Sequence, residues 1–275
     1  MIHLPLLRAG QPYTSLDQIE VAHIASGKPL AQVSQANRGL IARDLNAMDE
    51  NRAAVQVRSV AELLTICQKA SVLFSTAELP LGAGVQTPDD YIAQVSASTG
   101  LPRSLARANM AKIRLVFDEM TAVLDGLTRG LDLAVLDAGQ SVQDGRPLSY
   151  VPLANALGCV LPSNSPGVHS LWLPAIPLKT PLALKPGREE PWTPYRIAQA
   201  LIAAGCPPQA LSFYPTDHGG SAEILLRCGR SLLFGGGATV EPWLDDPGVQ
   251  IHGPGRSKIV IGADICFWDS MIDPL

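Results

Sequence analysis

The second half of the chain alternates short apolar runs with stretches of helical periodicity. The apolar runs predict strands at residues 156–161, 181–185, 211–214, 231–234, 249–252 and 258–261. Between these runs, the pattern predicts helices over 195–204 and 221–228 and a helical turn over 238–244. Strands separated by helices of this length form right-handed crossovers within a parallel sheet. We therefore expect an α/β fold with a mostly parallel sheet and flanking helices.

The first half of the chain is predicted to be mainly helical. Apolar residues recur at helical spacing over 57–73 and over 104–127, and Gly130 lies just past the second stretch. Residues 1–50 have few clear periods and could form strands or irregular coil. In the second half, Thr193 is the predicted N-cap of a helix, with Pro194 at its first position.

Composition and charge narrow the classes of function. The 275 residues are 47% hydrophobic and 17% charged, which is typical of a globular protein and not of a disordered one. The net charge of −4 disfavours nucleic acid and anionic membranes as partners. The first residues, MIHLPLLRAGQ, lack the pattern of a signal peptide, and no apolar run approaches the roughly 18 residues of a membrane span.

Cysteine and histidine spacing argues against a disulfide scaffold and against a metal centre. The cysteines are scattered, odd in number and without a Cys-x-x-Cys pair: Cys67, Cys159, Cys206, Cys228 and Cys266. This usage fits reduced thiols and predicts a cytoplasmic protein. His218 has no ligand residue at metal-binding spacing, and a Gly-x-Ser-x-Gly nucleophile motif is absent.

Candidate chemistry lies where the predicted strands end, because ligands bind at the carboxyl ends of strands in an open parallel sheet. The residues expected there are 162–164, 185–188, 214–220, 234–237 and 252–255. Glycines in such turns let a ligand approach the backbone, and the N–H groups of a following helix can hold a pyrophosphate. Ordinary strand-to-helix turns would explain the glycine run 235–237 equally well when it is taken alone.

The order of these segments resembles the aldehyde dehydrogenase superfamily over residues 147–264. That family has, in order, Pro-x-Asn, Lys-Pro-x-Glu, Gly-Phe/Leu-Pro-Pro, Phe-Thr-Gly-Ser and Glu-Leu-Gly-Gly-Lys segments. The corresponding segments here are LPSNSP (161–166), LKPGREEP (184–191), AGCPPQAL (204–211), LFGGGATV (233–240) and HGPGRSKIVI (252–261). The resemblance implies a Rossmann-like cofactor domain and binding of NAD or NADP.

The resemblance also implies a domain organisation. Residues 1–137 would form an N-terminal region whose helices pack on the cofactor domain, and 159–275 would form the nucleotide-binding α/β domain. Asp144-Gly145 predicts a β-hairpin, and residues 138–158 match the oligomerisation arm of the family, which implies a homo-oligomer in the full-length form.

The resemblance assigns roles to individual residues. Asn164 would supply the oxyanion-hole amide, and His252 stands where the family has its general-base glutamate. The cofactor-binding positions are Pro162, Lys185, Gly187, Arg188, Phe234, Gly236, Gly237 and Val240. Lys185 would bind the adenosine ribose, Gly236 and Gly237 the pyrophosphate, and Val240 the adenine. Each has a structural alternative, such as an asparagine that caps a turn or a valine in the core.

Departures from the family pattern carry information about the cofactor. Arg188 replaces the ribose-binding glutamate, and a guanidinium has no acceptor for ribose hydroxyls. It can instead pair with a 2′-phosphate, which weakly favours NADP, although an exposed arginine beside two glutamates is the simpler explanation. Gly237 replaces a serine and Ser163 a tryptophan, and such departures resemble the divergent acyl-CoA reductase branch.

The catalytic cysteine of the family would follow these segments by a few tens of residues. Cys266 comes too early, on a predicted helix, and we expect it to be buried and inert. We therefore expect a chain without the catalytic domain, from a parent that oxidises an aldehyde to an acid through a cysteine thioester. An acyl-CoA reductase acting on an acyl thioester and a non-catalytic nucleotide-binding fragment are the alternatives.

Overall fold

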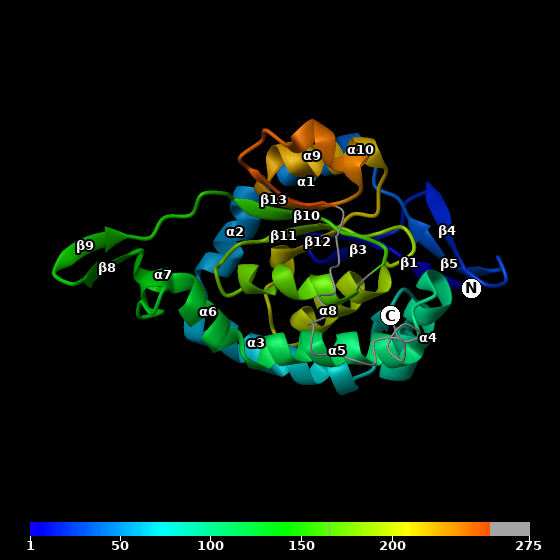
Figure 1. Cartoon of the computed structure of the whole chain (residues 1–275), viewed down its shortest axis with the longest axis horizontal. Helices are drawn as coiled ribbons and strands as arrows, with labels where there is room; N and C mark the ends of the chain where they lie inside the picture. Colours follow the sequence, from blue (N-terminus) through cyan, green and yellow to red (C-terminus); the bar gives the residue numbers. More distant parts are fainter. Residues whose placement is uncertain (165, 254–275) are drawn as a thin grey trace, which may run out of the picture.

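The computed structural model describes residues 1–164 and 166–253, and its centre is a seven-stranded sheet (Figure 1). The strands follow the order β14-β13-β10-β11-β12-β2-β3. Their bounds are β2 (Leu6–Arg8), β3 (Gln11–Tyr13), β10 (Ala156–Val160), β11 (Leu182–Lys185), β12 (Leu211–Phe213), β13 (Gly229–Phe234) and β14 (Val249–His252). β14 through β12 pair in parallel, whereas β2 and β3 are antiparallel, so the predicted α/β fold with a mostly parallel sheet is confirmed.

The order of the parallel strands creates one switch point. From β10 the chain proceeds to β11 and β12 on one side, and then to β13 and β14 on the other. This is the doubly wound arrangement, in which connections leave β10 in opposite directions. A crevice is therefore expected at the carboxyl ends of β10 and its two neighbours.

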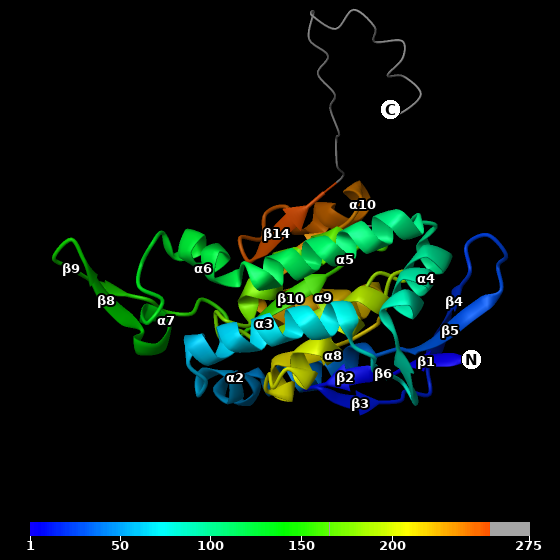
Figure 2. The same ribbon diagram turned by 90° about the horizontal axis from the view of Figure 1, so that it is seen from below.

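Helices cover both faces of the sheet, and the alternation of side chains along the strands explains why both faces are apolar. Leu182 and Leu184 of β11 belong to a core shared with α3 (Val60–Thr76), α5 (Arg103–Asp118) and α8 (Trp192–Ala203). Ala183 faces the opposite side, where α1 (Arg38–Leu45) and α9 (His218–Arg227) pack together. Figures 1 and 2 show the two helical layers on either side of the sheet.

Residues 1–50, for which the sequence left strands and coil open, contain both strands and helices. β1 (Ile2–Leu4), β5 (Pro29–Ser34) and β4 (Gln18–Ala22) form a small sheet beside the main one. α2 (Met48–Gln56) follows α1. A hairpin of β6 (Leu79–Leu81) and β7 (Gly84–Gln86) leads into α4 (Pro88–Thr99), where Thr87 and Asp90 form a capping box.

The helix predicted over 104–127 is two helices. α5 ends at Asp118, and α6 (Met120–Thr128) begins after Glu119, whose backbone angles of φ −91° and ψ 17° leave the helical region. Because Met120 and Leu124 are buried like the apolar residues before the break, the periodic pattern runs through it unchanged. The hydrophobic spacing therefore could not reveal this break.

The predicted hairpin around Asp144-Gly145 is present. β8 (Gln140–Gln143) and β9 (Arg146–Ser149) pair antiparallel after the short helix α7 (Val135–Ala138). Asp144 and Gly145 both have positive φ, as a two-residue type I′ turn requires. In Figure 1 this hairpin projects from the body of the protein as an arm.

Several short helices complete the described chain: η1 (Pro166–Leu171), η2 (Leu173–Ala175), η3 (Pro208–Ala210), α10 (Gly237–Val240) and η4 (Glu241–Trp243). None of the described helices is long and apolar enough to cross a membrane. The strand predicted over 258–261 and the helix predicted around Cys266 lie outside the described residues.

Candidate functional site

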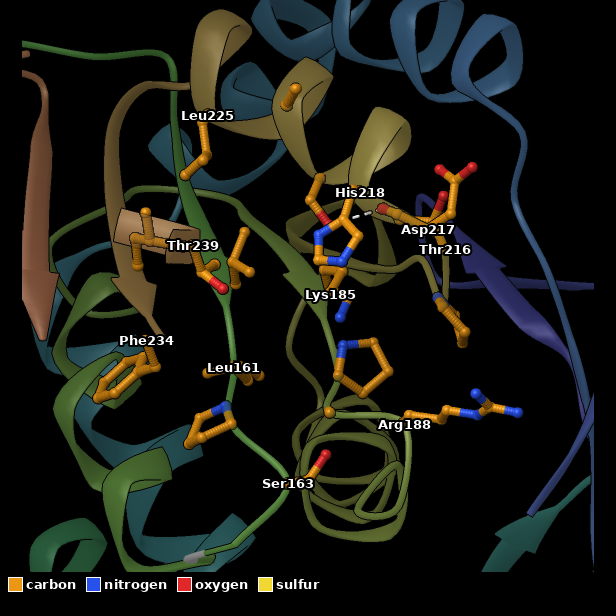
Figure 3. Close-up of a pocket in the computed structure, with 18 of the residues that line it drawn as sticks. Leu161, Ser163, Lys185, Arg188, Thr216, Asp217, His218, Leu225, Phe234 and Thr239 are labelled. Carbon is orange, nitrogen blue, oxygen red and sulfur yellow. Dashed lines mark hydrogen bonds between the residues drawn. The ribbon is translucent and has the colours of Figure 1, made fainter. Parts of the chain in front are cut away.

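A cavity of about 850 Å³ lies at the carboxyl ends of β10, β11 and β13, where the doubly wound sheet has its switch point (Figure 3). Its polar lining comes from the segments that follow β10 and β11 and from the start of α9. Its apolar lining comes from α9, from the end of β13 and from the segment that follows β13. Position and size are those of a small-molecule site in an open α/β sheet.

Gly187 brings the segment after β11 into direct contact with the end of β10. A Cβ added at Gly187 would lie 2.5 Å from the carbonyl oxygen of Pro162 and 2.6 Å from the Cα of Ser163. The backbone N–H of Glu189 also donates a hydrogen bond to Ser163 Oγ over 3.3 Å. Because the two backbones touch here, only glycine fits at this position.

Lys185 is the last residue of β11, and its ammonium points into the cavity (Figure 3). Burial lowers the pKa of Lys185, and the carboxylates of Glu189 and Asp217 oppose that shift. Within residues 1–164 and 166–253, no hydrogen bond or ion pair satisfies this ammonium. A partly desolvated cation of this kind favours an anionic or hydroxyl-bearing ligand.

Arg188 lies at the rim of the same cavity and is exposed. Its guanidinium makes no hydrogen bond or ion pair with another described residue. Opposite these two cations, the cavity is lined by apolar side chains: Leu225, Leu233, Phe234, Pro242 and Trp243. One half of the cavity therefore suits phosphate or ribose oxygens, and the other suits a flat base.

A buried hydrogen-bond network holds the segment after β11 in place. Trp172 Nε1 donates to His169 Nδ1 over 3.3 Å, so the proton of the ring lies on Nε2, which donates to Glu190 Oε2 over 2.8 Å. Glu190 Oε1 accepts the backbone N–H of Thr193 at 2.9 Å and its hydroxyl at 2.6 Å. His169, Glu190 and Thr193 are fully buried.

This network corrects the prediction for the start of α8. Thr193 is not the N-cap of α8, which begins at Trp192, because the buried Glu190 carboxylate supplies the acceptor for the first turn. The same carboxylate ties the segment that carries Lys185 and Arg188 to η1, which follows β10. The segments that follow β10 and β11 are thus held together by side chains.

No protein-family model matches this sequence, and no curated protein matches it. Solved structures match nearly the whole chain. An aldehyde dehydrogenase from Bartonella henselae is 15% identical, with a TM-score of 0.71 over 92% of this chain and 52% of its own. An NADP-dependent glyceraldehyde-3-phosphate dehydrogenase from Bacillus halodurans C-125, complexed with NADP, is 13% identical, with a TM-score of 0.70 over 88% and 50%. A succinate-semialdehyde dehydrogenase from Burkholderia pseudomallei is 17% identical, with a TM-score of 0.68 over 88% and 48%.

The chain has the fold of part of an aldehyde dehydrogenase. It spans about half the length of these aldehyde dehydrogenase structures. The resemblance suggested by the order of the sequence segments is confirmed at the level of the fold, including the Rossmann-like cofactor domain.

Within this aldehyde dehydrogenase fold, the structure brings together one group of the predicted cofactor residues. Those that line the cavity are Pro162, Lys185, Gly187, Arg188 and Phe234. Gly236 and Gly237 lie at the start of α10, and a Cβ added at either would meet no atom within 4 Å. Val240 is buried in a small core with Leu225, Leu233 and Val249, so the structure shows a packing role for it.

The two predicted catalytic residues lie outside the cavity lining. Asn164 is exposed at the end of the segment that follows β10. His252 ends β14 and stacks on Phe234, with ring centroids 4.3 Å apart. Burial lowers the pKa of His252, and its Nε2 is buried without a hydrogen-bond partner among the described residues. His252 therefore contacts Phe234, which lines the cavity, but does not line the cavity itself.

Sequence reasoning assigned no binding role to the connection between β12 and α9 or to the start of α9, which contribute Thr216, Asp217, His218 and Ser221 to the cavity. The strand-end position of residues 214–220 was the available signal. Asp217 is the N-cap of α9 and accepts the backbone N–H of Gly220 at 2.9 Å.

The described residues contain no group of three His, Cys, Asp or Glu side chains that could hold a metal ion.

Proposed function

We propose that the cavity binds NAD(P), with NADP preferred, and that this chain is the cofactor-binding part of an aldehyde-oxidising dehydrogenase. The observation that carries the proposal is Lys185, which has no hydrogen-bond or ion-pair partner among the described residues and faces an apolar wall across a cavity of about 850 Å³. The NADP complex of the neighbour from Bacillus halodurans supports the choice of cofactor. When bound, the nicotinamide ring of the cofactor accepts a hydride from the substrate.

The residues present fit a dinucleotide. The apolar side chains of Leu225, Pro242 and Trp243 offer a surface for the adenine ring. Lys185 donates to ribose or phosphate oxygens, and Arg188 supplies a second cation but no acceptor for ribose hydroxyls. This pair of cations supports binding of a 2′-phosphate, and hence NADP.

Gly236 and Gly237 are the proposed pyrophosphate contacts. A Cβ added at either glycine would meet no atom of the described residues within 4 Å, so a ligand can approach the backbone there. The role of Gly237 is testable because an added methyl group would meet the ligand but not the protein. Asn164 and His252 keep their predicted catalytic roles as proposals, the first as an oxyanion donor and the second as a general base.

The fold supports a proposal for the reaction. We propose that the full-length parent oxidises a small-molecule aldehyde through a thioester on a catalytic cysteine other than those of this sequence, and that it assembles as a homo-oligomer through the arm of β8 and β9. The described cysteines, Cys67, Cys159, Cys206 and Cys228, are free and buried, which supports a reducing, cytoplasmic location. Aldehyde-dependent formation of NADPH is the assay for this chemistry.

Titration of the purified chain with NADPH and with NADH, followed by nucleotide fluorescence, tests cofactor binding. We expect NADPH to bind more tightly than NADH, because Arg188 and Lys185 can both pair with the 2′-phosphate. Lys185→Met keeps the apolar stem and should weaken both nucleotides by at least about tenfold, the effect of losing one charge-assisted hydrogen bond. Arg188→Glu should reverse the preference in favour of NADH.

Arg103→Glu is the matched control for charge. Arg103 is an exposed residue of α5 outside the cavity lining, so the same reversal of charge there should leave both affinities unchanged. The proposal fails if wild-type protein binds neither nucleotide at millimolar concentration. An Arg188→Glu variant with an unchanged ratio of affinities would remove the argument for NADP.

A further inference from the structure

The cationic half of the cavity contains a third nitrogen-bearing side chain. His218 belongs to the cavity lining, is exposed, and makes no side-chain hydrogen bond within residues 1–164 and 166–253. Figure 3 shows the His218 and Lys185 side chains directed into the same space, while the Arg188 side chain extends toward the rim. Three potential donors thus belong to the lining of one cavity.

The segment that carries His218 is held rigidly. The backbone N–H of Ala36 donates to the carbonyl of Pro215 over 2.8 Å, and Thr216 Oγ1 donates to the carbonyl of Ala36 over 2.6 Å. Gly220 packs so closely on Thr216 that a Cβ there would lie 2.0 Å from Oγ1. A ligand therefore need not order this backbone in order to contact the imidazole, which favours a specific contact.

The nearest carboxylate of the same segment already has a partner. Asp217 Oδ1 accepts the N–H of Gly220 as the N-cap of α9, and in Figure 3 its carboxylate points away from Lys185. It does not form an ion pair with Lys185, Arg188 or His218 among the described residues. The Asp217 carboxylate is therefore not paired with the donors of this cavity.

We propose that His218 is a specificity-determining residue of the dinucleotide site and donates a hydrogen bond to the 2′-phosphate of NADP. This inference rests on the proposed function, because it deepens the cofactor choice at the same cavity. The phosphate would lie between Lys185, Arg188 and His218, and the adenine would occupy the apolar half formed by Leu225 and Trp243. NAD lacks the phosphate and would gain little from the imidazole.

Three substitutions separate hydrogen bonding from stacking. His218→Gln keeps a donor without the ring, His218→Phe keeps a ring without the donor, and His218→Ala removes both. We expect the alanine and phenylalanine variants to bind NADPH about three- to tenfold more weakly, while the glutamine variant stays within about twofold of wild type. Affinity for NADH should change by less than about twofold in all three variants.

The outcomes are distinct. The inference would be overturned if His218→Ala weakened NADPH and NADH equally and His218→Phe restored both affinities, because this would show stacking on the base. Unchanged affinities in every variant would also overturn it. His23→Ala is the matched control, because His23 lies outside the cavity lining. If wild-type protein binds neither nucleotide, the proposed function fails and the inference fails with it. If wild-type protein binds NADPH and every His218 variant binds it equally well, the inference alone fails.

Discussion

Replacement of Gly187 by alanine tests whether the segment after β11 is held against the end of β10. The added Cβ would lie 2.5 Å from the carbonyl oxygen of Pro162 and 2.6 Å from the Cα of Ser163. Both neighbours are backbone atoms, so neither can rotate away as the end of a flexible side chain would. The two segments must move apart to accept one methyl group.

The size of the effect follows from that displacement. An ordinary contact begins near 3.4 Å, so the segments must separate by about 0.9 Å. Overpacking a close contact costs about 1–3 kcal/mol, and we expect the upper end because backbone must shift. A loss of about 3 kcal/mol lowers the folding equilibrium constant more than a hundredfold and Tm by roughly 5–10 °C. Because Lys185 and Arg188 flank the shifted residue, NADPH affinity should also fall at least about tenfold.

Gly237→Ala is the matched control for this experiment. A Cβ at Gly237 meets no protein atom within 4 Å, and the residue begins α10, so alanine should leave Tm unchanged or slightly raised. If the pyrophosphate lies on Gly237, NADPH affinity should still fall. Thermal unfolding by circular dichroism and fluorescence titration measure the two effects separately. A Gly187→Ala variant with the Tm of wild type would refute the reasoning about backbone contact.

Two further predictions concern buried groups. Arg196 donates to three backbone carbonyls at the end of α3 and in β7, and burial lowers its pKa to about 10. Arg196→Met leaves those carbonyls unsatisfied and should cost about 3–5 kcal/mol in urea unfolding; a cost below 1 kcal/mol would contradict this account. Burial also raises the pKa of the Cys67, Cys206 and Cys228 thiols from 9.0 to about 12. Unfolded thiols ionise above pH 9 while the buried ones stay protonated, so stability should fall as pH rises from 9 towards 12, by about 1.4 kcal/mol per thiol at pH 10. Cys67→Ala should remove its share of that loss, and an identical pH dependence in this variant would count against the assignment.

The sequence by itself determined the class of fold and where its strands end. The predicted strands over 156–161, 181–185 and 211–214 agree with β10, β11 and β12 within one residue at each end. Parallel strands covered on both faces must be apolar at every position, so they are read as continuous runs bounded by glycine and proline. The turn at Asp144-Gly145 could also be predicted from the local sequence, because a type I′ turn needs positive φ at two adjacent residues and Asp-Gly favours that conformation.

The tertiary structure alone decided which strand ends meet and what each side chain contacts. The order β13-β10-β11-β12 depends on pairing between residues far apart in the chain, and the pairing of β11 with β12 brings Lys185 and His218 to one cavity. Likewise, Glu190 caps α8 in place of Thr193 because His169, 21 residues earlier, supplies a buried donor. Periodicity and capping signals record interactions within one or two turns. The partners in a cavity or a buried network are chosen by packing across the sheet, which no local pattern contains.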